Sequence, residues 1–272
     1  MRHRKPKRRR PCRIVYAALV PLAFAMAWEE PVEKALSPVA HRAHRDRGPA
    51  EAGARPVAPR PDIVPRGAWH ADESLVRERA STMENVRAVF VHHTSQPNDY
   101  DCGDVPRLLR QLEEEHVERG WDDLGYNFVV DHCGRIYEGR AGALDRSVEG
   151  AHTKGFNART LGIAALGTFG PGARVPRAML DSIAALAAWK LRPGADPRGT
   201  TRLVSSSGES RVEKGDHARF HVITGHRDAY ETSCPGKALY DELGRVREET
   251  ARLRERARSH RPGKPPAEAG GR

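Results

Sequence analysis

The sequence predicts an α/β fold, a single domain in which a central mixed β-sheet is flanked by helices. The length of 272 residues leaves room for one sizeable domain with tails. Between residues 62 and 256, short apolar runs of strand length alternate with longer runs of helical periodicity. One short run, residues 161–166, is apolar throughout, as in a strand that is covered on both faces of its sheet.

Four further segments have the pattern of strands. Residues 86–92 (VRAVFVH) form a β-branched run of strand length. Residues 127–131 (NFVVD) and 135–138 (RIYE) flank a tight turn and are predicted to form a hairpin. Residues 220–224 are predicted to form one more strand, which follows a polar loop at residues 205–219.

Three segments are predicted to be helices. Residues 104–119 start at an aspartate cap and place apolar side chains at helical spacing, with His116 on the same side. Residues 176–191 have proline in the first turn and an apolar stripe along one side. Residues 237–256 form the third helix. A domain of this size, about 190 residues, would bury roughly 70% of the surface of its unfolded chain.

The positive charge of the chain is concentrated at its two ends. The formal net charge is +10, yet residues 1–13 hold 8 Lys/Arg and no acid, and residues 245–272 hold 9 Lys/Arg against 4 Asp/Glu. The residues between them hold 29 basic and 32 acidic side chains. Because this middle part is slightly acidic and shows no interleaving of aromatic and basic residues, a nucleic-acid partner is not expected.

The two ends are predicted to lie outside the folded domain at residues 62–256. Residues 1–27 have a basic stretch, an uncharged apolar run and small residues near its end, so we expect a secretory signal peptide, with an uncleaved anchor as the alternative. Residues 28–61 are predicted to be a disordered linker rich in Pro, Ala and Arg, and residues 257–272 a disordered basic tail. A membrane protein with several spans is excluded, because one apolar run alone is longer than a strand.

Four cysteines need an assignment. Cys12 lies in the expected signal peptide, which leaves three in a compartment where disulfides persist. Three is an odd number, so one thiol needs another role. Cys234 is the candidate, because His226 lies eight residues before it in a polar, glycine-bounded loop. Cys102 and Cys133 can then form a disulfide.

A zinc site is one such role for Cys234. A catalytic zinc needs three protein ligands and one open position, and His226 and Cys234 provide two of them. The apolar strand that ends in His92 and His93 offers a third. Side chains alternate across a strand, so only one of these histidines can join the site, and spacing does not decide which. A core histidine and a buried free thiol are the alternative interpretation.

Seven segments resemble one known family, the peptidoglycan recognition proteins or type 2 N-acetylmuramoyl-L-alanine amidases. They cover essentially the whole predicted domain in one order: IVPRGAW (63–69), VFVHHTS (89–95), LGYNFVVD (124–131), GRIYEGR (134–140), GAHTKGFN (150–157), LGIAALGTF (161–169) and ITGHRDAYETSCPG (223–236). The chain departs from the family at His70, where relatives usually have glycine. We expect a secreted bacterial member of this family.

The resemblance implies a zinc ion held by His92, His226 and Cys234, with His93 as a structural residue. It places the catalytic tyrosine of the family at Tyr126, where a phenol can donate a hydrogen bond to charge that develops on the scissile carbonyl oxygen.

Three more residues receive roles from the resemblance. Thr232 falls where relatives carry Thr or Lys beside the metal-bound water, with a turn-stabilising hydroxyl as the alternative. His152 and Asn157 are expected to line the substrate groove, although His152 could instead be a loop histidine held by backbone hydrogen bonds. Apart from the resemblance, Asp228 is expected to orient a liganding histidine, because such ligands usually need a second partner.

The implied activity is zinc-dependent hydrolysis of the amide between N-acetylmuramic acid and L-alanine in peptidoglycan, by a secreted or wall-associated monomer. The main alternative is a binding module of the same fold, but non-catalytic members of the family have lost a metal ligand and this chain retains all three positions. A cysteine peptidase would explain neither His92 nor Tyr126. The basic tail could contact anionic wall polymers, or it could be a solvated helix end.

Overall fold

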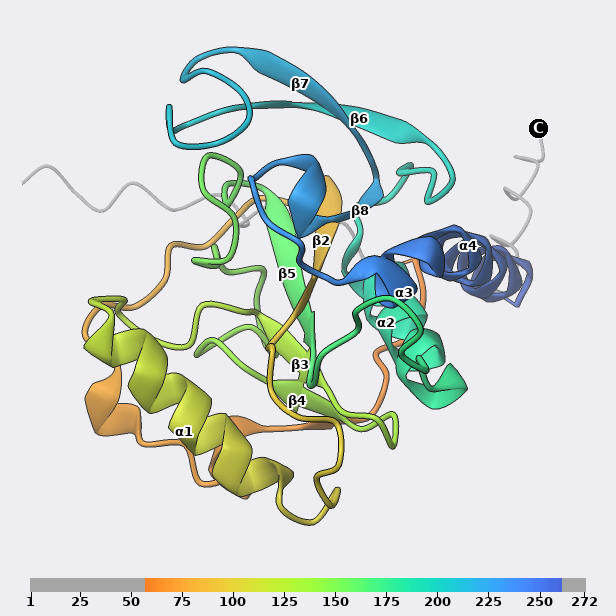
Figure 1. Ribbon diagram of the computed structural model, residues 1–272. Coiled ribbons are helices and arrows are strands. Elements are labelled where there is room, and N and C mark those ends of the chain that lie inside the picture. The colour runs from red at the N-terminus through yellow and green to blue at the C-terminus, as the bar shows by residue number, and fades with distance from the viewer. Residues whose placement is uncertain (1–56, 261–272) are drawn as a thin grey trace, which may run out of the picture. The chain divides into compact units, whose positions relative to one another are not determined.

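The computed structural model describes residues 57–260, and Figure 1 shows a central sheet with helices on both sides. The main sheet has six strands in the order β1-β4-β3-β5-β2-β8, and β6 pairs with β7 in a separate sheet. The strands are β1 (Ile63–Val64), β2 (Ala88–His93), β3 (Phe128–Val130), β4 (Ile136–Glu138), β5 (Thr160–Ala165), β6 (Thr200–Val204), β7 (His217–His221) and β8 (Ile223–Gly225).

The strand pairing of the main sheet is mixed. β2 lies between β5 and β8 and runs parallel to both. β3 is parallel to β5 and antiparallel to β4, and β1 is parallel to β4. This confirms the predicted α/β fold with a central mixed sheet. Because β2, β5 and β8 run in one direction, their carboxyl ends meet at one edge of the sheet, where loops can bring side chains together.

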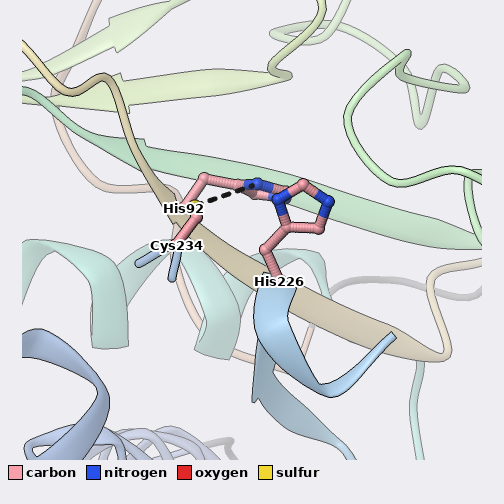
Figure 2. A group of neighbouring side chains, drawn as sticks. All are labelled: His92, His226 and Cys234. Atoms are coloured by element: carbon pink, nitrogen blue, oxygen red, sulfur yellow. Dashed lines mark hydrogen bonds between the residues drawn. The ribbon is translucent and has the colours of Figure 1, made fainter. Parts of the chain in front are cut away.

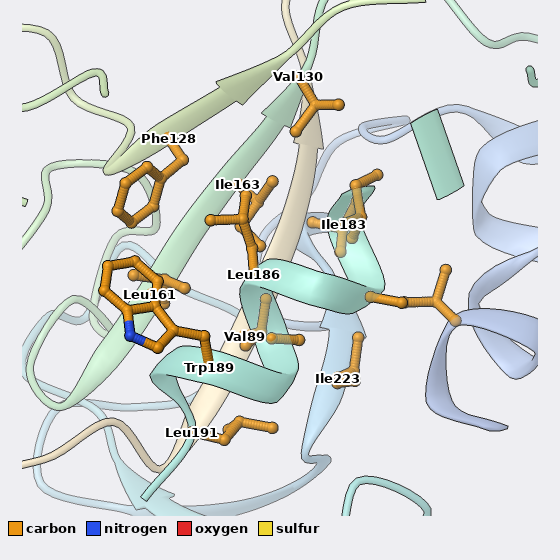
Figure 3. Close-up of a cluster of buried hydrophobic side chains, with 14 of the residues drawn as sticks. Val89, Phe128, Val130, Leu161, Ile163, Ile183, Leu186, Trp189, Leu191 and Ile223 are labelled. Carbon is orange, nitrogen blue, oxygen red and sulfur yellow. The ribbon is translucent and has the colours of Figure 1, made fainter. Parts of the chain in front are cut away.

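Helices cover the two faces of the main sheet. Side chains alternate along β2, so Val89 and Val91 join the core that α2 and α4 cover, while Phe90 and His92 point to the opposite face. Figure 3 shows α2 lying against the first of these faces, with Trp189 near Phe128. The helices are α1 (Val105–Glu118), α2 (Arg177–Lys190), α3 (Lys237–Asp241) and α4 (Leu243–Ser259).

Arg254 fastens α4 to the end of α2. Its side chain is 1% exposed, and its guanidinium donates to the carbonyl oxygens of Ala188, Leu191 and Arg192 at 3.3, 2.9 and 2.8 Å. The last carbonyls of a helix have no partner within the helix, so this arginine supplies donors that α2 itself lacks.

A buried ion network fixes the segment that precedes β2 against α1. Arg66 is 5% exposed and its guanidinium pairs with Glu73, Glu113 and Asp123 at 2.7, 2.6 and 3.1 Å. It also donates to the carbonyl of Gly139. Glu113 and Asp123 are themselves buried, so the network satisfies two carboxylates that would otherwise lack a partner in the interior.

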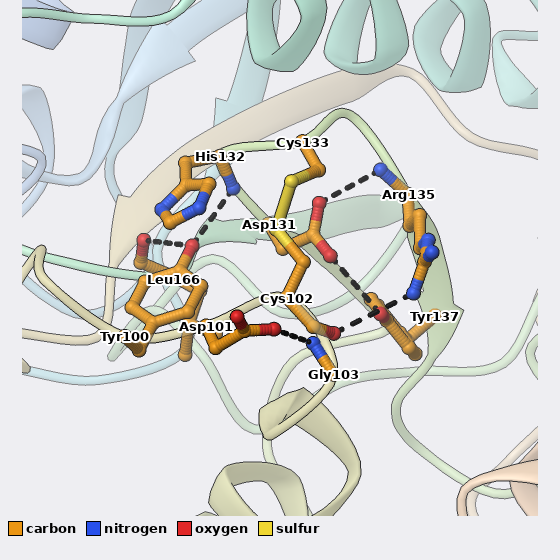
Figure 4. The surroundings of a disulfide bond; sticks show 10 residues. All are labelled: Tyr100, Asp101, Cys102, Gly103, Asp131, His132, Cys133, Arg135, Tyr137 and Leu166. Atoms are coloured by element: carbon orange, nitrogen blue, oxygen red, sulfur yellow. Dashed lines mark hydrogen bonds between the residues drawn. A yellow bond between two sulfur atoms is a disulfide. The ribbon is translucent and has the colours of Figure 1, made fainter.

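The predicted disulfide is present between Cys102 and Cys133, which are 31 residues apart in sequence (Figure 4). It joins the segment before α1 to the turn between β3 and β4. Beside it, the hydroxyl of Tyr100 accepts from the backbone N–H of His132 at 2.7 Å and donates to the carbonyl of Leu166 at 3.2 Å. The bond and these contacts together hold the turn against the start of α1.

Two predicted elements are each divided in the structure. The strand predicted at residues 220–224 is the end of β7 and the start of β8, separated by Val222. The N–H of Val222 donates to Gly199 at 3.1 Å, next to the small sheet, while its carbonyl accepts from Val89 of the main sheet at 2.8 Å. The chain passes from one sheet to the other at this residue. The helix predicted at 237–256 breaks at Glu242, into α3 and α4.

The predicted boundaries also need correction. The loop predicted at residues 205–219 includes the first three residues of β7, and α4 continues to Ser259 rather than ending at 256. At the other end, Val57 and Ala58 are 6% exposed, so the folded part starts before residue 62. The expected signal peptide, most of the linker and the end of the tail lie outside the described residues. No helix within residues 57–260 is long and apolar enough to cross a bilayer.

Candidate metal centre

Three side chains from separate parts of the sequence converge at the carboxyl edge of the sheet. His92 is near the end of β2, His226 begins the short turn after β8, and Cys234 lies in the loop that follows. One ligand atom from each lies within 4.8 Å of the other two. Figure 2 shows the two imidazoles beside the sulfur, and Nδ1 of His92 is 3.8 Å from Sγ of Cys234. The parallel pairing of β2 with β8 brings these segments together.

The structure separates His92 from His93. The imidazole of His92 is fully buried and faces the other two donors, with ring centroids of His92 and His226 4.5 Å apart. The side chain of His93 turns away and pairs with the hydroxyl of Ser95 at 3.1 Å. Its backbone N–H donates to Sγ of Cys234 at 3.3 Å. Only His92 can therefore serve as the ligand, and His93 contributes through its backbone.

Two turns hold His226 and Cys234 in place. The carboxylate of Asp228 accepts from the N–H of Gly225 at 3.0 Å, from the hydroxyl of Thr224 and from the hydroxyl of Tyr240. Asp228 thus fixes the turn that carries His226. Asp228 was expected to orient a liganding histidine, and it does so here through the turn, because its oxygens accept from these three donors and not from His226.

The hydroxyl of Thr232 accepts from the backbone N–H of Cys234 at 3.2 Å. This contact shapes the loop that presents the sulfur, as the turn-stabilising alternative describes. A direct part in the chemistry is not visible in this contact and stays a prediction.

Burial sets the protonation of the three donors. It holds the pKa of His92 well below the ordinary value, with a further contribution from His226 and His152. Burial also lowers the pKa of His226 to about 4 and raises the pKa of the Cys234 thiol to about 12. Both imidazoles are therefore neutral, which is the state that binds a metal, and a thiolate here requires a cation. Two imidazoles and one sulfur are a donor set that fits zinc, with one position left open.

His152 lies against the same site. Its Nδ1 is 3.2 Å from Nε2 of His92 and 3.0 Å from the hydroxyl of Thr153, and its ring is 5% exposed. The side-chain oxygen of Asn157 accepts from the backbone N–H groups of His152 and Thr153 at 3.0 and 2.8 Å. Asn157 therefore holds the loop that places His152. The structure brings both residues to the site, and contact with substrate stays a prediction.

Tyr126 stands on another side of His92. Their ring centroids are 5.2 Å apart, and burial raises the pKa of the Tyr126 phenol. Within residues 57–260 no group hydrogen-bonds its hydroxyl. Because the phenol stays protonated and its hydroxyl is free, it can donate to an oxygen that enters the site.

His116 of α1 supports Tyr126, a role that the sequence analysis missed. Nδ1 of His116 accepts from the backbone N–H of Gly125 at 3.0 Å, and its ring packs edge-on to Tyr126 at 5.4 Å. The helical spacing of residues 104–119 placed His116 on the side of the apolar stripe. A titratable side chain within an apolar stripe indicates that this side chain has a polar partner in the fold, and His116 carried that signal.

Known proteins are similar to this chain over the region that holds the three donors. The profile of the N-acetylmuramoyl-L-alanine amidase family matches residues 82–237, a span that contains all three donors. The chain belongs to this family. Peptidoglycan-recognition protein 2 of Holotrichia diomphalia is 30% identical over 184 residues, which are 67% of this chain and 83% of the relative. The N-acetylmuramoyl-L-alanine amidase of Homo sapiens is 32% identical over 187 residues, which are 67% of this chain and 28% of the human protein.

A solved structure in this family is similar to the chain as well. Peptidoglycan recognition protein-LE, in complex with tracheal cytotoxin, a monomeric diaminopimelic acid-type peptidoglycan, aligns with a TM-score of 0.52 and 26% identity. The alignment covers 66% of this chain and 91% of that structure. The expectation of a bacterial source is not borne out, because the named relatives of this amidase-family chain are from Holotrichia diomphalia and Homo sapiens.

Proposed function

We propose that the protein is a zinc-dependent amidase that hydrolyses the bond between the N-acetylmuramoyl group and L-alanine of peptidoglycan. This reaction releases the stem peptide from the glycan strand. The observation that carries the proposal is the convergence of His92, His226 and Cys234, whose ligand atoms lie within 4.8 Å of one another. Membership of the amidase family and the similarity to a structure with a bound peptidoglycan fragment support it.

The metal ligands and Tyr126 would have separate roles in the reaction. His92, His226 and Cys234 would hold zinc, which when bound polarises a carbonyl and lowers the pKa of water. Tyr126 donates a hydrogen bond from its free hydroxyl to the scissile carbonyl oxygen, where negative charge develops. Cys234 serves as a ligand and not as a nucleophile, since its buried sulfur faces the two histidines. No covalent bond between substrate and protein is needed.

The remaining residues shape the place where the substrate binds. His152 would line the substrate site beside His92. Asn157 holds His152 in position through a hydrogen bond to the backbone of its loop. Thr232, which holds the loop of Cys234, would face the incoming water. We further propose that the protein acts outside the cytoplasm as a monomer, after removal of residues 1–27, and that the basic tail contacts anionic wall polymers.

The test is the release of stem peptides from purified peptidoglycan. We expect new amino groups of L-alanine to appear with the zinc-loaded protein and to disappear after chelation. Cys234→Ser should lose both zinc and release, while the matched control Ser233→Ala, an exposed neighbour, should keep both.

Two outcomes would contradict the proposal. Release that persists in the metal-free protein would exclude the zinc mechanism. Binding of peptidoglycan by the zinc-loaded protein with no release at all would assign the chain to the recognition modules that do not cleave.

A further inference from the structure

The two-stranded sheet of β6 and β7, called here the ribbon, has two unlike faces. Register partners share a face, so the inner face carries Leu203 and Phe220, which pack against Phe90 and Phe156. Every side chain of the opposite face is exposed. This outer face consists of Thr200, Arg202, Val204, His217, Arg219 and His221.

The centre of the outer face is a pair of facing arginines. Arg202 and Arg219 are direct register partners, and neither has an acidic partner among the described ion pairs. Like charges directly opposite each other destabilise a sheet, and a two-stranded ribbon has little stability to spare. By contrast, nearby Arg198 is paired with both Glu248 and Glu255. Repulsion between the two facing arginines therefore destabilises the ribbon, and a bound anion would remove this repulsion.

The chemistry of the outer face fits the oxyanions that guanidinium groups bind, of which phosphate is one, and does not fit bases. Guanidinium groups bind phosphate oxygens with two parallel hydrogen bonds. Two guanidinium groups on one rung can bind one phosphate or two consecutive phosphates. His217, His221 and Thr200 flank the pair with polar atoms. Val204, 50% exposed, offers an apolar contact beside them. The face has no Phe, Tyr or Trp on which a nucleobase could stack.

We propose that the outer face of the ribbon is a docking surface for a linear phosphodiester polymer without bases, such as a polyol phosphate. The face extends over five rungs, roughly 15 Å, which suits an extended chain rather than a single ion. β7 leads through Val222 into β8, which ends directly before His226. A polymer held on the ribbon would therefore keep the metal centre close to it, without taking part in the chemistry.

The experiment measures binding of fluorescent poly(glycerol phosphate) by the full chain at low and moderate salt. The double variant Arg202→Gln/Arg219→Gln should bind at least about tenfold more weakly, and its affinity should depend less steeply on salt. The matched control Arg107→Gln/Arg174→Gln removes two exposed arginines elsewhere and should stay within about twofold of the wild type. All variants keep the basic ends of the chain, so the difference reports on the ribbon.

A second variant separates binding from folding. Arg202→Glu places opposite charges on the central rung, so it should leave the melting temperature unchanged or higher while it weakens polymer binding. Equal binding by the wild type and the double variant would overturn the proposal, as would equal losses in the double variant and its control. Tighter binding of single-stranded DNA with the same number of phosphates would assign the face to nucleic acid instead.

Discussion

The imidazole of His152 lies directly on Gly162 of β5. A Cβ atom at position 162 would lie 2.5 Å from Cδ2 of His152 and closer still to Cγ of the same ring. Glycine is therefore required at this point of the strand, because a larger residue would displace the histidine that contacts His92.

Gly162→Ala should consequently disturb the site more than the fold around it. We expect a loss of about 1–3 kcal/mol in the free energy of unfolding, and weaker zinc binding, because His152 must move. Gly170→Ala is the matched control, since a Cβ atom at position 170 would have no neighbour within 4 Å and the backbone there is not left-handed. Urea unfolding and zinc titration would measure both variants. Equal behaviour of the two would show that His152 moves aside without consequence.

Neighbouring histidines should respond differently to the same substitution. His92→Gln removes a donor and should abolish stoichiometric zinc binding, whereas His93→Gln should retain about one zinc per chain because only its backbone contacts the sulfur. Metal analysis after dialysis checks this. Retention of zinc by the His92 variant would show that another donor completes the site.

His116 should make the stability of the metal-free protein depend on pH. Burial lowers its pKa to about 4, from an ordinary value near 6.5, and the side chain is 2% exposed. Above pH 6.5 the folded and unfolded states are both neutral at this residue. Between pH 6.5 and 4 only the unfolded state binds the proton, so stability falls as the pH falls, by about 3 kcal/mol in total, and the effect is complete below pH 4.

The comparison that isolates this contribution is with His116→Gln, which does not titrate. With a chelator present, the free energy of unfolding of the wild type should fall relative to that of the variant as the pH falls from 6.5 to 4. The same variant, when loaded with zinc, should lose turnover while it keeps its metal, because His116 supports Tyr126 and touches no donor. A pH-independent difference between the proteins would contradict the assignment.

The disulfide should matter for stability and not for the metal. On the chain-entropy account, cross-linking Cys102 to Cys133 across 31 residues contributes about 3–4 kcal/mol. Cys102→Ala/Cys133→Ala should lower the free energy of unfolding by that amount and still bind zinc. Loss of zinc in this variant would show that the turn between β3 and β4 is coupled to the metal centre.

The buried ion network predicts a large effect at one arginine. Arg66→Met leaves Glu113 and Asp123 buried without a cation, which should cost about 3–5 kcal/mol. Arg177→Met removes an exposed pair with Asp181 and should cost about 0–1 kcal/mol. Thermal unfolding of the two variants compares them, and similar losses would mean that water reaches the network.

Much of this architecture could be predicted from the sequence because its signals are local. The runs at residues 88–91 of β2 and 161–165 of β5 are apolar without interruption, and α1 and α2 carry apolar side chains along one side, although Asp104 makes no capping hydrogen bond. His226 and Cys234 could be proposed as donors because they share a polar loop after a strand, whereas the choice of His92 over His93 came from the family resemblance.

The rest depends on contacts that no local pattern contains. The ribbon of β6 and β7 has polar residues on one face and few apolar ones on the other, so it resembles a loop. The change of sheet at Val222 interrupts an apolar run with no break in its composition. His70 adopts a positive φ of 57°, a conformation that favours glycine and that only the backbone reveals.

Arg254 has a practical consequence for anyone who produces the domain. Its guanidinium reaches back over sixty residues of sequence to the carbonyls of Ala188, Leu191 and Arg192. A recombinant fragment that ends before this arginine would leave those carbonyl oxygens without their donor. It would also expose apolar surface at the end of α2 to solvent, which favours aggregation. Expression boundaries and affinity tags therefore belong beyond residue 260.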